Sequence, residues 1–122
     1  RPMPAVRAEL VSTLTLTPTT GQIGDDGTQN FTNRKGGTYA YHDRHAFNLV
    51  GPDEVVDLGP IVNVKVLYAR ADTAVKIKIT TADGTDQILP VEGVLSWQSN
   101  TKPITAIKLS GTGAGVLAFA GD

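Results

Sequence analysis

The chain has 122 residues, a formal net charge of −1 and no cysteine, so it has the size of one domain and uses neither disulfides nor thiolate-bound metals. The near-neutral charge disfavours nucleic-acid binding, which needs an excess of Lys and Arg, and no apolar run reaches the length of a membrane span. Hydrophobic residues make up 40% and aromatic residues only 6%, which predicts a core of Val, Ile, Leu and Ala.

The first predicted element is a strand from about residue 10, in the stretch AVRAELVSTLTLTP (5–18). Its leucines alternate with threonines, and its β-branched residues and closing Pro18 favour a strand over a helix. Residues 1–9 are a candidate N-terminal arm. Since the chain begins at Arg1 with Met3 inside it, we expect processing or a preceding segment.

Residues 18–44 are rich in Gly, Asp, Asn and Thr, which predicts a long polar loop. Structureless loops of this length are uncommon in compact domains and are typical of functional segments. Four large apolar side chains interrupt the polar sequence, and two cations beside them are available for acidic groups on a partner. We therefore predict an interface, with these candidate contact residues: Ile23, Phe31, Arg34, Lys35, Tyr39, Tyr41 and Trp97.

Regular alternation begins near residue 46 and continues to the end of the chain. Val62, Val64, Val66 and Tyr68 share one face of the clearest strand, and VKIKITTADGTDQILPV (75–91) predicts a β-hairpin that turns at Asp83-Gly84. Turn signals recur every 8 to 12 residues or so, which favours an antiparallel sandwich over βαβ units. The expected fold is all-β: a single jelly-roll-like β-sandwich over residues 1–122, with about eight or nine strands.

The sequence contains no recognisable catalytic, cofactor or metal motif. His42 and His45 would point to opposite faces of a strand, and Asp25 and Asp26 are the only acids near Asp43, so we predict no metal site. The glycines of SGTGAG (110–115) are followed by strand residues instead of the helix that a phosphate-binding loop requires. We therefore expect a protein that is not an enzyme and binds no cofactor.

The aromatic residues leave one alternative open. Trp97, Tyr39, Tyr41 and Tyr68 could together form a platform for a carbohydrate or receptor. A core or interface role for Trp97 is the competing interpretation, because large side chains are scarce in this chain.

Residues 58–122 resemble small all-β virion proteins of tailed bacteriophages, through LGPIVNVKVLYARA, VKIKITTADGTDQILPV and KPITAIKLSG. The resemblance covers about half of the chain. It implies a non-enzymatic structural protein located on the virion and assembled in the host cytoplasm. Capsid decoration or cementing of the shell is the favoured role, and a head fibre, collar or tail component is the alternative.

The same resemblance implies the partners. They would be other copies of the chain, as a closed symmetric oligomer for which a trimer is the working hypothesis, and a major capsid or other virion protein. Neither a nucleic acid nor a membrane is expected as a partner.

Overall fold

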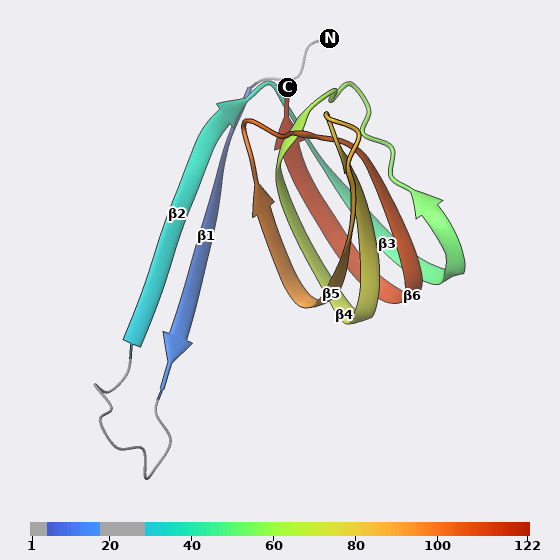
Figure 1. The fold of residues 1–122 in the computed structure, drawn as a ribbon, viewed down its shortest axis with the longest axis horizontal. Helices are drawn as coiled ribbons and strands as arrows, with labels where there is room; N and C mark the ends of the chain where they lie inside the picture. Colours follow the sequence, from blue (N-terminus) through green and yellow to red (C-terminus); the bar gives the residue numbers. More distant parts are fainter. Residues whose placement is uncertain (1–4, 18–28) are drawn as a thin grey trace.

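The computed structural model describes residues 5–17 and 29–122, which form two antiparallel sheets and confirm the predicted all-β class. The six strands are β1 (Val6–Leu16), β2 (Gln29–Tyr39), β3 (Tyr41–Val55), β4 (Val64–Thr81), β5 (Asp86–Gln98) and β6 (Ile104–Gly121). β1 and β2 form one sheet, called here the hairpin. The other four strands, in the order β3-β6-β4-β5, form the second sheet, called here the body (Figure 1).

The long strands of the body are strongly bent. Val64, the first residue of β4, pairs with Gly121 and also with Ile104, and Ile104 pairs in turn with Thr81 at the end of β4. The two ends of β4 therefore come together. Figure 1 shows the same bend in β4, β5 and β6, so that the two halves of the four-stranded sheet face each other as two layers.

The predicted count of eight or nine strands is wrong, because several turn signals lie inside strands. The segment around Asp72 and Thr73 interrupts the register of β4 between Ala71 and Val75, and GTGA (111–114) lies within β6, with Gly111 and Gly113 at positive φ. Such interruptions bend a strand without ending it. The two segments predicted as separate strands on either side of residues 72–73 are thus two halves of β4, and those on either side of 111–114 are two halves of β6.

The core lies between the two halves of the bent sheet. Leu67 in the first half of β4 and Ile77 and Ile79 in the second half are fully buried, as are Ile107 and Leu109 of β6. The predicted hairpin at Asp83-Gly84 is confirmed, with Gly84 at a φ of 84° and Ile77 opposite Leu89.

The predicted loop over residues 18–44 is wrong from residue 29 onwards. Residues 29–39 form β2, which pairs with β1 along its whole length, from Val6 opposite Tyr39 to Leu16 opposite Gln29. Residues 6–9 of the candidate arm likewise belong to β1. The rest of the predicted loop, residues 18–28, lies outside the described residues.

Among the described residues, the apolar contact between hairpin and body lies near the root, which we define as the end of the hairpin that carries Val6 and Tyr39. There Val6, Ala8, Leu10 and Tyr39 form a small apolar cluster with Val66 and Ala120 on the outer face of the body. Figure 1 shows the rest of the hairpin extending away from the body. The body therefore has a core of its own, and the described part of the hairpin packs on it through the root cluster.

Candidate interaction surface

The two faces of β1 differ: one is mostly apolar and the other mostly polar. Successive side chains of a strand point to opposite faces, so Val6, Ala8, Leu10, Leu14 and Leu16 lie on the face directed at the body. The register places Tyr39 and Phe31 of β2 on the same face, opposite Val6 and Leu14. We call this the inner face of the hairpin.

The far end of the inner face has no cover among the described residues. Leu14, Leu16 and Phe31 are 57%, 47% and 54% exposed, respectively. We call these three residues the apolar tip. They lie at the end of the hairpin opposite the root, beyond the polar pair Ser12 and Asn33, and Figure 1 shows this end of β1 and β2 apart from the body. Phe31 was one of the predicted contact residues; the two leucines were not.

The outer face of the hairpin is polar. Arg34 Nη1 donates a hydrogen bond to Glu9 Oε1 at 3.2 Å, and Arg7 Nη2 lies 3.8 Å from Glu9 Oε2. Threonines and an asparagine continue this face towards the tip, where Thr15 Oγ1 donates to Asn30 Oδ1 at 3.0 Å. Val11, 49% exposed at the centre of β1, is the exception on this polar face.

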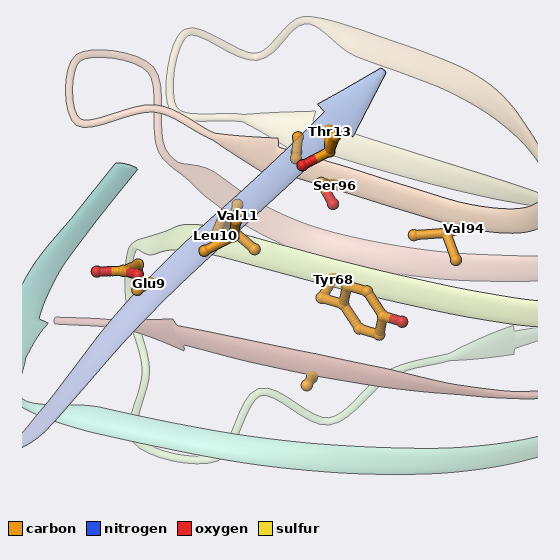
Figure 2. Close-up of a pocket in the computed structure, with 9 residues that line it drawn as sticks. Glu9, Leu10, Val11, Thr13, Tyr68, Val94 and Ser96 are labelled. Carbon is orange, nitrogen blue, oxygen red and sulfur yellow. The ribbon is translucent and has the colours of Figure 1, made fainter. Parts of the chain in front are cut away.

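Two cavities follow β1 where it crosses the outer face of the body. The larger, of about 820 Å³, is lined on the β1 side by residues 9–13 and on the body side by Tyr68, Val94, Ser96 and Ala118. We call it the β1 cleft. Figure 2 shows Tyr68 and Val94 on the side of β1 that faces away from β2. The cleft is therefore bordered by the strand edge that β2 does not occupy.

The smaller cavity, of about 320 Å³, lies at the root and is called the root pocket. Val6 and Ala8 line it on the hairpin side; Val66, Tyr68 and Ala118 are among its lining residues on the body. The two cavities share Glu9, Leu10, Tyr68 and Ala118. Together they form one groove along β1, apolar at the root and more polar towards the centre.

Asp122 fixes the junction between hairpin and body. Its Oδ1 accepts a hydrogen bond from the Ala40 backbone N–H at 3.0 Å, and its Oδ2 accepts one from Lys65 Nζ at 2.9 Å. The Ala40 hydrogen bond and, after it, Lys65 lower the pKa of the Asp122 carboxyl group. Ala40 is the single residue between β2 and β3, so this carboxylate acts at the position where the hairpin joins the body.

The other predicted contact residues are distributed over the hairpin and the body. Tyr39 is only 5% exposed, and Tyr41 packs against the main core, so both contribute to the fold of the single chain. Arg34 is engaged with Glu9 on the outer face, whereas Lys35 lies opposite Leu10 on the inner face. Ile23 lies outside the described residues.

Trp97 borders a third cavity, of about 360 Å³, beneath the hairpin. It packs partly against the main core, and the cavity is also lined by Asn33, Lys35 and Gln98. The structure therefore places Trp97 both in the core and beside polar side chains. The proposed partners of a shared aromatic platform do not gather there, because Tyr39 is buried at the root and Tyr68 lines the groove along β1.

The two histidines do not come together in a metal site. His45 Nε2 lies 2.9 Å from Glu54 Oε2 on the same strand, while His42 lies at the root pocket beside Asp43. Within residues 5–17 and 29–122, no three His, Cys, Asp or Glu side chains are grouped as metal ligands. Asp25 and Asp26 lie outside these residues.

Comparison with protein-family models, with curated proteins and with solved structures gave no match. Over the part of the chain that the structure describes, no helix is long and apolar enough to cross a membrane. The class shown is thus an all-β domain with a projecting amphipathic hairpin. Sequence analysis missed Leu14 and Leu16 as contact candidates, although their alternation with threonine was visible, because a partner strand for them was not predicted.

Proposed function

We propose that this chain is a non-enzymatic structural protein of a tailed-phage virion, which decorates or cements the capsid by contacts between subunits. The observation that carries the proposal is the apolar tip. Leu14, Leu16 and Phe31 are each about half exposed on a hairpin that projects from the body (Figure 1). An isolated two-stranded hairpin is marginally stable in water, so an arm of this kind needs a surface to cover it.

The side chains of the apolar tip are of the kind that binds a protein surface. Contiguous exposed apolar side chains with polar surroundings are typical of protein interaction sites, and here the outer face of the hairpin supplies the polar surroundings through Thr15 and Asn30. The resemblance of residues 58–122 to phage virion proteins supports the same class of function. A head fibre, collar or tail component would use such an arm in the same manner and is the alternative position on the virion.

The proposal is tested by weakening the tip without disturbing the body. The double variant Leu14→Ser/Phe31→Ser is expected to remain folded and to lose co-sedimentation with DNA-free phage heads that lack this protein. Val50→Ser is the matched control, because Val50 is 79% exposed on β3 and outside the hairpin. Unchanged co-sedimentation of the double variant, or the absence of any binding by the unmodified protein to heads, collars and tails, would contradict the proposal.

If residues 18–44 were a loop, as the sequence predicted, deleting residues 24–37 would be a natural test; with β2 in this segment it is not. The deletion removes most of β2, which pairs residue by residue with β1, and it would expose the root cluster as well as the tip. The point substitutions separate the two effects, since Leu14 and Phe31 lie beyond the cluster formed by Val6, Ala8 and Leu10.

A carbohydrate-binding role is the second candidate, and the cavity beside Trp97 favours it. Asn33, Lys35 and Gln98 line this cavity, and amide side chains next to an indole can bind sugar hydroxyls while the ring covers an apolar sugar face. Because Trp97 also packs against the core, Trp97→Ala alone confounds binding with folding. Asn33→Ala, at an exposed position, is expected to weaken binding on a glycan array with the fold intact, and an array without signal for the unmodified protein excludes this role.

A further inference from the structure

We propose that two copies of this chain associate through their β1 strands, which pair antiparallel about a two-fold axis at Val11 and join the two hairpins into one four-stranded sheet. This inference rests on the proposed function, because it names the first partner of the hairpin as a second copy of the chain. It follows from four features of the described residues: an open strand edge, a groove beside it, a register and an uncovered apolar tip.

The open edge belongs to β1. Within residues 5–17 and 29–122, β1 pairs with β2 and with no other strand. Its sequence, VRAELVSTLTL, contains neither proline nor lysine, two residues that commonly protect an edge strand from pairing. Its two charged side chains, Arg7 and Glu9, lie on the outer face, where Glu9 is already paired with Arg34. The edge strands of the body differ: β3 contains Pro52 and β5 contains Pro90. β1 is therefore the edge best suited to accept another strand.

The register follows from the length of β1. The strand runs from Val6 to Leu16, so Val11 is its midpoint, and full-length antiparallel pairing with an identical strand places Val11 opposite itself. Val6 then lies opposite Leu16 of the second copy, and Ala8 lies opposite Leu14. The inner faces of the two hairpins lie on the same side of the new sheet. A two-fold axis normal to the sheet relates the two strands, and rotation about such an axis does not exchange the two sides of the sheet.

The same register avoids like charges and gives the exposed valine a function. Arg7 lies opposite Thr15 and Glu9 opposite Thr13, whereas a register centred on Glu9 would place two carboxylates face to face, which is destabilising. Val11, the one apolar side chain among polar ones on the outer face of β1, packs against its own copy at the axis.

The edge of β2 does not offer an equivalent pairing. The midpoint of Gln29–Tyr39 is Arg34, so full-length pairing of β2 with itself would place two guanidinium groups opposite each other. Gly36 and Gly37 on this strand also provide no side chain to pack across an interface.

The groove along β1 has the position that the second strand requires. The β1 cleft is lined by residues 9–13, which are centred on Val11. At the root, the pairing brings Leu14 and Leu16 of the second copy beside Ala8 and Val6, which line the apolar root pocket together with Val66 and Tyr68. Each copy thus offers a groove to Leu14 and Leu16 of the other, in one symmetric contact. Phe31, on β2, lies one strand further from the axis and is left for the phage particle.

A designed disulfide tests the register. The chain has no cysteine, so Val11→Cys can form only a bond between copies. Opposed Cα atoms in an antiparallel pair are about 4.5–5.5 Å apart, within the range of about 4.4–6.8 Å that a disulfide spans. Thr15→Cys, on the same face of the same strand, is the matched control, because the two Thr15 positions are eight residues out of register, or about 26 Å at 3.3 Å per residue.

We expect light scattering to show a dimer of the unmodified protein, Val11→Cys to cross-link under mild oxidation, and Thr15→Cys not to. Val11→Glu, which places two carboxylates at the axis while each faces Arg34 of its own hairpin, is expected to give a folded monomer, whereas Val50→Glu stays dimeric. A monomeric or trimeric unmodified protein, or equal cross-linking of Val11→Cys and Thr15→Cys, overturns the inference. A monomer that still binds phage heads leaves the proposed function intact, and a dimer that binds no phage particle overturns only that function.

Discussion

The body and the hairpin are built from the same kind of strand but use their apolar side chains differently. In the body, Leu67, Ile77 and Leu109 are fully buried because the sheet bends over and covers its own inner face. In the hairpin, the apolar tip repeats the same alternation but remains about half exposed. The body thus covers its own apolar side chains, whereas the apolar tip of the hairpin stays exposed in the single chain.

The bend accounts for the difference. β4 and β6 each have 18 residues with an interruption near the middle, so each strand contributes to both layers. β1 and β2 have 11 residues each and pair without any register shift. An uninterrupted hairpin of this length extends past the body instead of folding back onto it (Figure 1).

The largest predicted effect comes from comparing one kind of substitution, Leu→Ala, in the body and in the hairpin. Leu67→Ala, at a fully buried position, is expected to lower the free energy of unfolding by about 2–5 kcal/mol, through lost transfer energy and the remaining cavity. Leu14→Ala, at a position that is 57% exposed, is expected to change it by less than about 0.5 kcal/mol when measured on the Val11→Glu background, which removes the proposed second copy. Urea denaturation measures both, and equal losses would show that the hairpin belongs to the core.

A smaller effect is expected where β6 bends. A Cβ at Gly115 would overlap the carbonyl oxygen of Arg70 and the ring of Phe47, so Gly115→Ala should destabilise the body by roughly 1–3 kcal/mol through overpacking. Ala114→Ser, at the exposed neighbouring position, is the control and should be near neutral. Thermal unfolding followed by circular dichroism distinguishes them. If the two variants were equally stable, the bend would accommodate a Cβ at residue 115 without any loss of stability.

The sequence predicted the strands of the body well and their connections less well. Alternation in 75–91, 104–110 and 115–120 correctly indicated strands, because one side of each segment is buried. In 61–70 the strand begins only at Val64, and Val62 is exposed outside it. The sequence GTGA, however, is equally suited to a turn and to an interruption within a strand, since both use glycine at positive φ. Only the pairing of β6 with β4 decides between them, and that pairing is a long-range contact.

The hairpin shows a second limit of sequence analysis. β2 is polar on both faces along most of its length, so its composition is that of a loop, and its strand structure depends on pairing with β1. Val66 and Tyr68 show a related effect. They were grouped as one face of a strand, but the main core takes the alternate residues Leu67, Ala69 and Ala71, while Val66 faces the root of the hairpin.

The third prediction concerns the attachment of the hairpin. Tyr39 is 5% exposed and packs with Val66 and Ala120, so Tyr39→Ala should release the root while the core of the body stays intact. Amide hydrogen exchange is expected to show lost protection in β1 and β2 and unchanged protection at Ile77 and Leu109. The control is Thr38→Ala, the exposed neighbour on the outer face. Loss of protection throughout the body would contradict the independence of the two regions.

The smallest predicted effect is a pH dependence of the same attachment. The hydrogen bond from Ala40 and the contact with Lys65 favour the charged form of Asp122 and lower its pKa from the ordinary value of 3.8. Because the folded-state pKa is the lower one, the stabilisation is complete above that ordinary value and is lost as the pH falls from it through the lowered pKa. Below this window the protonated carboxyl group holds Ala40 and Lys65 less well, and the root of the hairpin loosens.

The single tryptophan reports on this change, because Trp97 borders a cavity that Leu10 and Lys35 of the hairpin also line. The emission maximum of Trp97 is expected to shift as the pH falls below 3.8, the ordinary pKa of an aspartate carboxyl group. Far-UV circular dichroism should still show a folded body at this pH. In Asp122→Asn the shift should be absent, because the amide does not titrate in this range. The pKa of Asp83 is also lowered, to about 2, by the hydrogen bonds from Thr81 and Thr85. Because Asp83 lies at the β4–β5 turn, away from the hairpin, Asp83→Asn should leave the fluorescence shift unchanged. If the fluorescence shift persists in Asp122→Asn, carboxyl groups other than Asp122 control the hairpin.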